Sequence, residues 1–138
     1  MEFYQMSLFN KILVSDMQKS EKWYRHTLGF QSVFKFRSEE NEVIMNHLRL
    51  NKYQDIMLIQ SDDFNSGNGC YINILVEDIE TIANSISEKY VLQYLEQMPW
   101  NAMEMTIVDP DGYQTTLTES NIKDEDFEKL MNSVSKKY

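Results

Sequence analysis

The sequence has 138 residues, of which 42% are hydrophobic and 25% charged, and this composition suits a folded domain better than a disordered chain. A net charge of −9 without a cluster of Lys and Arg excludes a typical nucleic-acid-binding protein, and no apolar run approaches the roughly 18 residues that cross a bilayer. Residues 1–5 lack the basic start and apolar stretch of a signal peptide, and Cys70 is the single cysteine. We therefore expect a cytoplasmic protein without an internal disulfide. The electrostatic field of its net negative charge favours a neutral or cationic ligand.

The first half of the chain predicts one helix among four strands. Residues 9–15 form an apolar segment typical of a strand, and Asp16 can cap a helix that Gly29 ends. The apolar residues between them lie at helical spacing. Further strands are predicted at residues 31–37, 43–50 and 55–60.

The second half predicts the same order of elements. Residues 62–69 contain the turn formers of a linker, and a strand at 71–76 leads to a helix capped by Asp78. Three strands follow at residues 91–97, 103–108 and 113–119. Asp109-Pro110-Asp111-Gly112 predicts a turn before the last strand, because proline presets φ and glycine suits the fourth position. Residues 124–137 predict a final amphipathic helix.

Two short segments repeat along the chain. Ile12-Leu13-Val14-Ser15-Asp16 returns as Ile74-Leu75-Val76-Glu77-Asp78, 62 residues later, and Tyr53-Gln54 returns as Tyr113-Gln114, 60 residues later. The nearly equal spacings indicate two related halves. We expect one domain over residues 1–138, with a first module at 8–61, a linker at 62–69, a second module at 70–120 and a C-terminal helical region at 121–138.

Several motifs in residues 8–120 carry a family resemblance. Val14-Ser15-Asp16 precedes Trp23-Tyr24 and Leu28-Gly29-Phe30, Val76-Glu77-Asp78-Ile79 opens the second half, and Pro99-Trp100 precedes the Asp109 turn. Their order resembles the glyoxalase/bleomycin-resistance/dioxygenase superfamily, also called vicinal oxygen chelate. The resemblance implies an α+β fold, in which two βαβββ modules form curved mixed sheets around a ligand cavity. It implies no single reaction, because this fold hosts several enzyme classes and non-catalytic drug binders.

In the enzymes of this family, His and Glu side chains from the first and last strands of each module bind a divalent metal. The matching positions here are Phe9, Tyr71, Thr116 and either Ile56 or Met57. None is a usual ligand of such a metal, although tyrosine occurs. We therefore expect no metal and no other cofactor.

The alternation of side chains along strands predicts which residues face the ligand cavity inside the curved sheets, which we call the cup. It assigns Ile12 and Val14 to the side under the helix, and the same reasoning applies to the second half. His47 can face the cup from the third strand, and Trp100 can wall its entrance. The expected ligand-binding residues are Phe9, Lys11, His47, Tyr71, Asn73, Trp100, Glu104, Thr106 and Thr116.

These residues favour a small-molecule-binding protein that resembles bleomycin-resistance proteins and sequesters an aromatic or cationic ligand. One alternative is a lyase, isomerase or dioxygenase-type enzyme with an atypical or absent metal site, in which His47 or Glu104 acts as acid or base. Another is a dimeric structural or regulatory module with a filled cup. We expect a homodimer in which the C-terminal helix packs on its own or the neighbouring subunit, and neither nucleic acid nor membrane as a partner.

Overall fold

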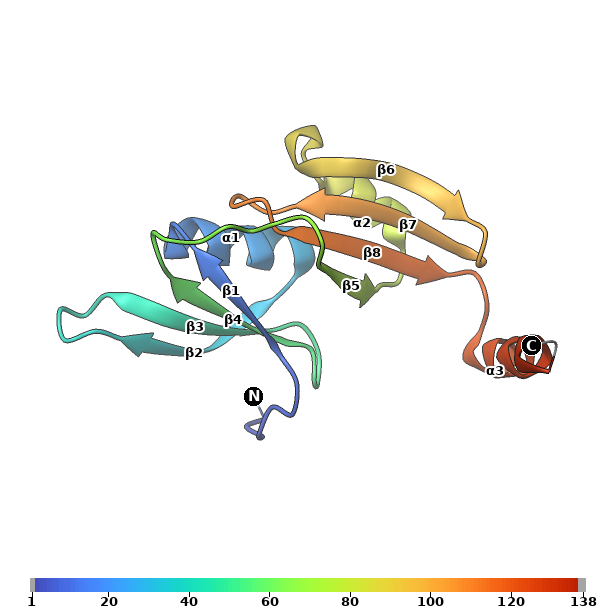
Figure 1. Ribbon diagram of the computed structural model, residues 1–138, viewed down its shortest axis with the longest axis horizontal. Helices are drawn as coiled ribbons and strands as arrows, with labels where there is room; N and C mark the ends of the chain where they lie inside the picture. Colours follow the sequence, from blue (N-terminus) through green and yellow to red (C-terminus); the bar gives the residue numbers. More distant parts are fainter. Residues whose placement is uncertain (1, 137–138) are drawn as a thin grey trace. The chain divides into compact units, whose positions relative to one another are not determined.

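A computed structural model describes residues 2–136 of the chain, which form two βαβββ arrangements and a final helix (Figure 1). The predicted α+β class and the repeated order of elements are therefore confirmed. The elements of the first arrangement are β1 (Asn10–Val14), α1 (Met17–Leu28), β2 (Gln31–Arg37), β3 (Val43–Arg49) and β4 (Asp55–Gln60). Those of the second are β5 (Tyr71–Leu75), α2 (Ile79–Ser85), a short 3-10 helix η1 (Glu88–Tyr90), β6 (Val91–Met98), β7 (Ala102–Val108) and β8 (Gln114–Ser120), followed by α3 (Asp124–Ser135).

The two arrangements build two four-stranded sheets with the same topology. The strand orders are β1-β4-β3-β2 and β5-β8-β7-β6. In each sheet the first strand pairs in parallel with the last, while β2, β3 and β4 pair antiparallel, as do β6 and β7. Each sheet is therefore mixed, and the chain order within it explains the internal repeat of the sequence.

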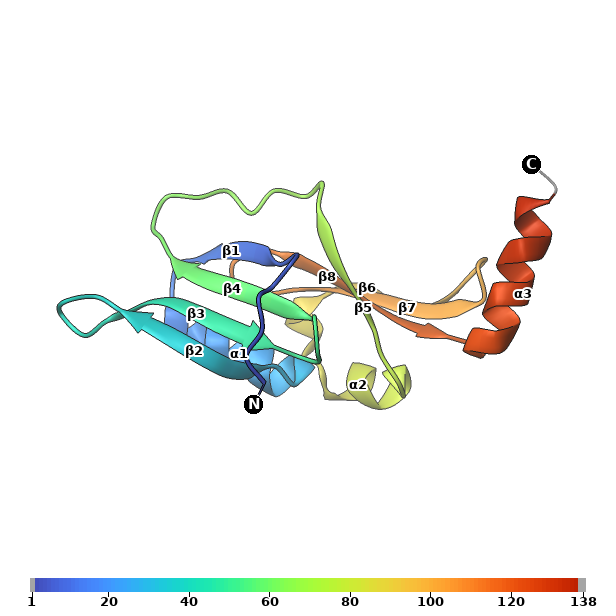
Figure 2. The same cartoon turned by 90° about the horizontal axis from the view of Figure 1, so that it is seen from below.

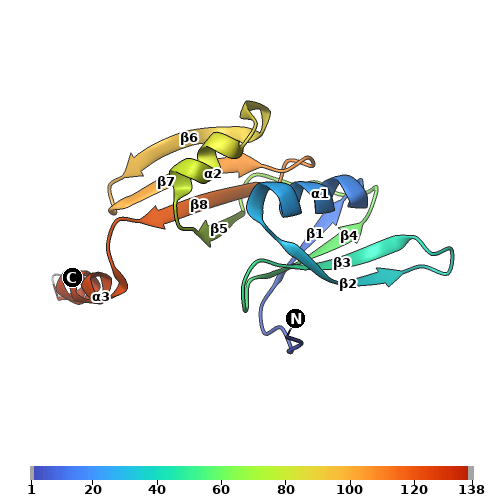
Figure 3. The same cartoon turned by 180° about the vertical axis from the view of Figure 1, so that it is seen from behind.

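Each sheet buries one face under its own helix. In the first sheet Val14, Leu48 and Leu58 have no exposed surface, and α1 contacts β3 and β4. In the second, Ile107 and Leu117 are equally buried, and Figure 3 shows α2 in front of β7 and β8. Burial of each such side chain stabilises the folded state by about 1.5–3 kcal/mol, so these apolar faces hold the sheets to their helices. We call the opposite face of each sheet its open face.

The chain folds into two compact units that do not follow the linker strictly. The first unit contains the chain up to Cys70 together with Val108–Tyr113, and the second contains Tyr71–Ile107 and the chain from Gln114 onward. The turn between β7 and β8 thus belongs to the first unit, although both strands, apart from Val108 at the end of β7, belong to the second.

Helix α1 begins and ends as its sequence predicts. The Asp16 side chain accepts a hydrogen bond from the Lys19 backbone N–H at 3.1 Å, which caps the helix. Gly29 follows with φ of 83°, a left-handed conformation that glycine adopts without steric cost. Trp23 and Tyr24 are buried on the sheet side.

Two carboxylates attach the turn after β7 to α1 and to Ser15, which lies just before this helix. The Tyr24 hydroxyl donates to Asp109 Oδ2 at 2.7 Å, and Asp109 Oδ1 accepts from the backbone N–H groups of Asp111 and Tyr113. The Ser15 hydroxyl donates to Asp111 Oδ1 at 2.5 Å. Burial raises the pKa of Asp109, and it raises the pKa of Tyr24 well above its usual value. The predicted turn is present, and the Asp109 side chain stabilises it by accepting these hydrogen bonds.

Helix α2 departs from the prediction at its start. Asp78 occupies the position before the helix, but its φ is 55° and its side chain caps no backbone N–H. Its carboxylate accepts from the Thr81 hydroxyl at 2.8 Å, while its backbone N–H donates to Glu119 Oε1 at 2.7 Å. With this left-handed backbone the carboxylate bonds to the Thr81 hydroxyl and to no backbone N–H of the first turn, so the predicted cap is wrong.

Helix α3 exposes all of its side chains. The predicted stripe of Phe127, Leu130, Met131 and Val134 is present, and each of these residues is at least 37% exposed. Lys137, where the helix was expected to end, lies outside the described residues, and the helix ends at Ser135. No helix in residues 2–136 has both the length and the apolar character needed to span a bilayer.

Candidate ligand-binding site

The open face of the second sheet carries the side chains that alternation predicts. On β5, Ile74 is buried on the helix side, whereas Tyr71 and Asn73 are exposed. On β7, Met105 and Ile107 are buried on the helix side. The period of two along these strands therefore places polar and aromatic side chains on the side away from α2.

A hollow of about 590 Å³ lies on this open face. It brings together six of the nine expected residues, drawn from four parts of the chain, and adds three from β6. The expected residues are Tyr71, Asn73, Trp100, Glu104, Thr106 and Thr116; the added ones are Leu92, Gln93 and Met98.

A hydrogen-bonded network connects the polar residues of the hollow. Trp100 Nε1 donates to Glu104 Oε2 at 3.0 Å. The Thr118 hydroxyl lies 3.0 Å from the same oxygen and 2.9 Å from Asn73 Oδ1, and it has one proton to donate. The Thr106 and Thr116 hydroxyls lie 2.9 Å apart. These contacts fix the side chains of three neighbouring strands in one arrangement.

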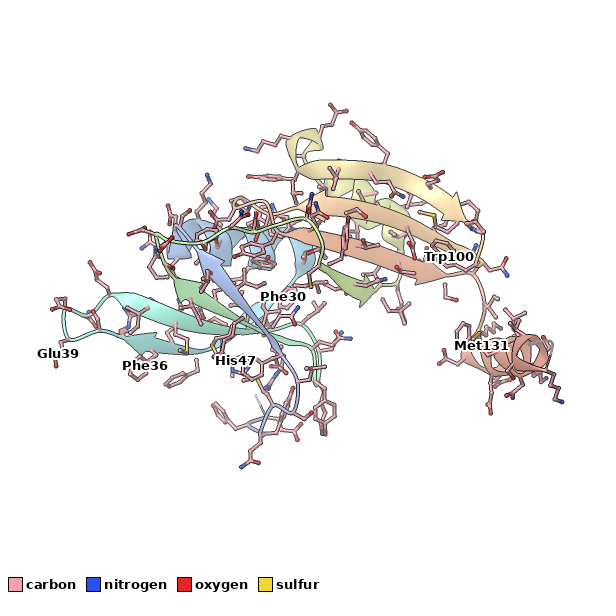
Figure 4. The ribbon with its side chains drawn as sticks, in the orientation of Figure 1. Phe30, Phe36, Glu39, His47, Trp100 and Met131 are labelled. Carbon is pink, nitrogen blue, oxygen red and sulfur yellow. The ribbon has the colours of Figure 1, made fainter. Side chains whose placement is uncertain are left out.

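The hollow combines an exposed aromatic rim with a buried acid. Trp100 is 60% exposed and Tyr71 is 52% exposed, whereas Glu104 is 8% exposed. Figure 4 shows Trp100 at the turn between β6 and β7. Glu104 Oε1 has no hydrogen-bond partner among residues 2–136, so this oxygen can accept a bond from a ligand. Glu96, on the neighbouring strand, is paired with Glu104 in the register but does not line the hollow.

The other three expected residues lie in the first unit. Lys11, Met57, His47 and Phe34 form one row across β1, β4, β3 and β2, so Lys11 and His47 share the open face of the first sheet, as expected. Phe9 precedes β1 and is half-buried. The row register also shows that Met57, not Ile56, corresponds to Thr116, because Lys11 pairs with Met57 as Asn73 pairs with Thr116.

His47 takes part in a charged cluster that the sequence did not indicate. Its Nε2 lies 2.6 Å from Asp55 Oδ1, and Arg49 Nε donates to the same oxygen at 2.7 Å (Figure 4 labels His47). Tyr4 donates to Asp55 Oδ2 at 2.8 Å. Burial alone would raise the pKa of Asp55, but the hydrogen bonds from His47, Arg49 and Tyr4 outweigh it and hold that pKa below its usual value.

Thr118 was also missed, although a signal for it exists. It lies two residues after Thr116 on the same strand, so alternation places both on one face. Leu92 had no such signal, because β6 pairs with β7 through irregular register around residues 91–96. A bulge changes which face a side chain occupies, and it cannot be read from this sequence.

Two further hollows lie elsewhere and differ in character. One, of about 730 Å³, lies by α1 and β2 and is crossed by an ion pair of 3.0 Å between Lys35 and Glu21. The other, of about 580 Å³, lies between α2 and β6 and contains Tyr94 and Met105. Neither joins an exposed tryptophan to a buried carboxylate, so the hollow on the open face of the second sheet is the better candidate.

The side chains at the family's metal positions do not suit a divalent transition metal. Phe9 and Met57 in the first unit offer no oxygen or nitrogen, and Tyr71 and Thr116 in the second offer neutral hydroxyls. Within residues 2–136, no group of three or more His, Cys, Asp or Glu side chains is arranged to hold a metal ion. The chemistry of these positions therefore does not fit the metal site of the family's enzymes.

Paired βαβββ units with a hollow on an open sheet face define a class of protein, and comparison identifies its family. The model of the Glyoxalase/Bleomycin resistance protein/Dioxygenase superfamily matches residues 7–117. The chain belongs to this superfamily. No curated protein sequence matches the chain.

Solved structures of the same fold are similar over most of the chain. A superfamily member from Sphaerobacter thermophilus DSM 20745 is 28% identical, with a TM-score of 0.64 over 81% of this chain and 94% of that one. A glyoxalase-related enzyme from Clostridium phytofermentans is 17% identical, with a TM-score of 0.64 and coverages of 86% and 97%. TioX from Micromonospora sp. ML1 is 14% identical, with a TM-score of 0.66 and coverages of 81% and 96%. The last two likenesses concern the fold alone.

Proposed function

We propose that this protein binds and sequesters a small aromatic, cationic molecule in the hollow on the open face of its second sheet, without a metal. The observation that carries the proposal is the bond between the exposed Trp100 indole and the buried Glu104 carboxylate, 3.0 Å long. It places a flat apolar surface beside a negative charge, which is the combination that an aromatic cation needs. Sequestration of an antibiotic of this kind is the role that we expect.

The electrostatics of the hollow favour a cation over an anion. Glu104 lines the hollow, and Glu96 is its register partner on the neighbouring strand, so both carboxylates contribute negative potential near the hollow. A ligand cation in the hollow is attracted by both carboxylates, and most strongly by Glu104, which lines the hollow. The residues that line the hollow include no Lys or Arg that would compete for the carboxylates.

The shape of the hollow supports binding of a ligand part of moderate size. A volume of about 590 Å³ falls within the range of small-molecule sites, roughly 300–1,000 Å³. Its threonine hydroxyls and Asn73 amide can exchange partners with a ligand, since they bond mainly to one another. The open hollow favours binding over the alternative of a module with a filled cup.

An enzyme remains the alternative to a binding protein. Its expected acid or base was His47 or Glu104, and each is hydrogen-bonded, His47 to Asp55 and Glu104 to Trp100. Turnover separates the two proposals, because a sequestering protein releases its ligand unchanged. Chromatography of the ligand after prolonged incubation with the protein makes that measurement.

The first test is a thermal-shift screen of aromatic cations, including glycopeptide antibiotics, with matched neutral and anionic aromatics. The best cation is then titrated into the wild type and into Glu104→Gln, which removes the charge and preserves the shape. We expect the variant to bind about tenfold more weakly, which corresponds to about 1.4 kcal/mol.

Glu88→Gln is the matched control, since it removes the same charge from an exposed position of the second unit outside the hollow. Equal losses in Glu88→Gln and Glu104→Gln would show that only net charge matters. A preference for anionic aromatics, or the same affinity in Glu104→Gln as in the wild type, would reject this site.

A further inference from the structure

The N-terminal segment is attached to the first unit mainly through the side chain of one tyrosine. Tyr4 lies against Arg49, whose Cζ is 4.1 Å from the centre of the Tyr4 ring. The Tyr4 hydroxyl donates to Asp55 Oδ2 at 2.8 Å and accepts from the backbone N–H of Tyr53 at 2.6 Å. Figure 2 shows this segment running across β4 and β3.

Other contacts of the segment are weak or few. Phe3 is 78% exposed and Leu8 is 83% exposed, so these two apolar residues bury little surface, whereas Met6 and Phe9 are half-buried. Glu2 forms an ion pair with Lys52 at 3.1 Å, but both side chains are more than half exposed, and such pairs contribute little. The Glu2 carbonyl oxygen accepts from Arg49 Nη1 at 2.5 Å. Tyr4 is therefore the main anchor.

The groups that receive Tyr4 are held in place without it. The Asp55 side chain is 1% exposed and stays bonded to His47 and Arg49 through its other oxygen. The Arg49 side chain is 8% exposed, and Arg49 and Asp55 pair in register across β3 and β4. A flat cation lies against the ring of Tyr4, and a carboxylate acceptor and a backbone donor meet at its hydroxyl.

We propose that Arg49, Asp55 and the Tyr53 backbone N–H form a binding site for a phenol group, and that Tyr4 occupies it as an exchangeable plug from the same chain. A free phenolic ligand would displace Tyr4 and release the N-terminal segment. This site lies in the first unit and uses none of the residues of the hollow in the second, so it is independent of the proposed sequestration.

The geometry selects phenols among aromatic molecules. The guanidinium of Arg49 attracts the face of a ring, which any aromatic ligand provides. Asp55 Oδ2 requires a donor, however, and the Tyr53 N–H requires an acceptor at the same atom. A hydroxyl satisfies both, whereas a methyl ether accepts without donating and would leave a buried carboxylate oxygen facing it without a hydrogen bond.

The test uses p-cresol, which has the ring and hydroxyl of tyrosine, and Tyr4→Ala, which empties the site. Binding is followed by the Tyr53 amide and His47 ring signals in NMR titrations of the full chain. Because a plug lowers the apparent affinity by the fraction of open molecules, we expect p-cresol to bind Tyr4→Ala at least tenfold more tightly than the wild type. We expect 4-methylanisole to bind Tyr4→Ala more weakly than p-cresol does.

Asp55→Asn in the Tyr4→Ala background should abolish the preference for p-cresol over 4-methylanisole. If Tyr4→Ala does not fold, Tyr4→Phe takes its place, since it keeps the ring and loses the hydroxyl that competes with p-cresol. Equal affinities of p-cresol for the wild type and the opened variant would overturn the proposal. So would signal changes that avoid Tyr53 and His47, or a p-cresol preference that survives Asp55→Asn.

Discussion

The indole Nε1 of Trp100 and the carboxylate of Glu104 are joined by a hydrogen bond of 3.0 Å across the turn between β6 and β7. One partner is mostly exposed and the other mostly buried, so the bond gives an exposed ring a defined orientation. A ring held in this way loses less conformational freedom when a ligand stacks on it, which favours binding.

Replacement of Trp100 should therefore weaken the binding of aromatic cations more than replacement of another exposed ring. We expect Trp100→Ala to lower affinity about tenfold, since a ring contact contributes on the order of 1 kcal/mol and the loss of orientation adds to it. The affinity of Trp100→Phe should lie between those of the wild type and Trp100→Ala, because phenylalanine keeps a ring but lacks the N–H. Calorimetric titration measures all three proteins.

Tyr94→Ala is the control for Trp100, since Tyr94 is 65% exposed in the same unit but does not line the hollow. It should leave affinity unchanged. Binding that is equally strong in Trp100→Ala and the wild type would place the ligand elsewhere.

Metal content follows from the residues at the family's ligand positions. Because Phe9, Met57, Tyr71 and Thr116 lack imidazole and carboxylate groups, we expect well under one equivalent of Zn, Ni, Mn or Fe in untagged protein. Elemental analysis after dialysis measures this. A full equivalent that is lost only when a residue of an open face is mutated would contradict the prediction.

Assembly should depend on the apolar stripe of α3. All four of its apolar residues are exposed within a single chain, and such a stripe is stabilised when a second subunit covers it. We expect a homodimer by light scattering at micromolar concentration, and a shift toward monomer in Leu130→Gln with Met131→Gln. Lys129→Gln, on the opposite side of the helix, should remain dimeric, and a monomeric wild type would reject the prediction.

The stability of the first unit should depend on pH through Asp55. Its pKa in the folded protein lies below the usual 3.8, so the stabilising contribution of its carboxylate is present above that value and is lost as the pH falls below it. In urea unfolding, Asp55→Asn should cost about 2 kcal/mol near neutral pH, because charge-assisted bonds weaken, and less in acid.

For Asp109→Asn we expect the opposite dependence of stability on pH, which makes it a useful comparison. Burial raises the pKa of Asp109, so its contribution is lost as the pH rises through the folded value. The difference between wild type and Asp109→Asn should therefore shrink with rising pH, whereas the difference for Asp55→Asn grows. The same slope for both variants would contradict the assigned shifts.

Local chemistry accounts for how far the fold could be predicted. Asp16 and Gly29 mark the ends of α1 because their effects act within one turn of helix, and the Asp109 turn acts over a few residues in the same way. Asp78 has the same residue type and sequence context as Asp16, yet caps nothing. Its backbone N–H is bonded to Glu119, 41 residues away, and this contact cannot be inferred from neighbouring residues.

In the candidate site, too, local sequence patterns predicted some features, whereas others depend on tertiary contacts. Alternation along strands placed Tyr71, Asn73 and Thr116 on one face, because strand geometry has a fixed period. The cluster of Tyr4, Arg49 and Asp55 was not predicted, since Tyr4 lies outside any element and reaches its partners through tertiary structure alone. Strand alternation also indicates neither the orientation of Trp100 nor its bond to Glu104.

The membership of Val108–Tyr113 in the first unit limits how this protein can evolve by recombination. A gene fragment that ended at Cys70 would encode every strand of the first sheet but not Asp109 or Asp111. Tyr24 would then keep a buried hydroxyl without its acceptor, at a cost of about 1–3 kcal/mol, and Ser15 would lose its partner. The two halves therefore cannot simply be exchanged, although the sequence repeats between them. A first half that is transferred to another protein would need the turn at Val108–Tyr113 as well.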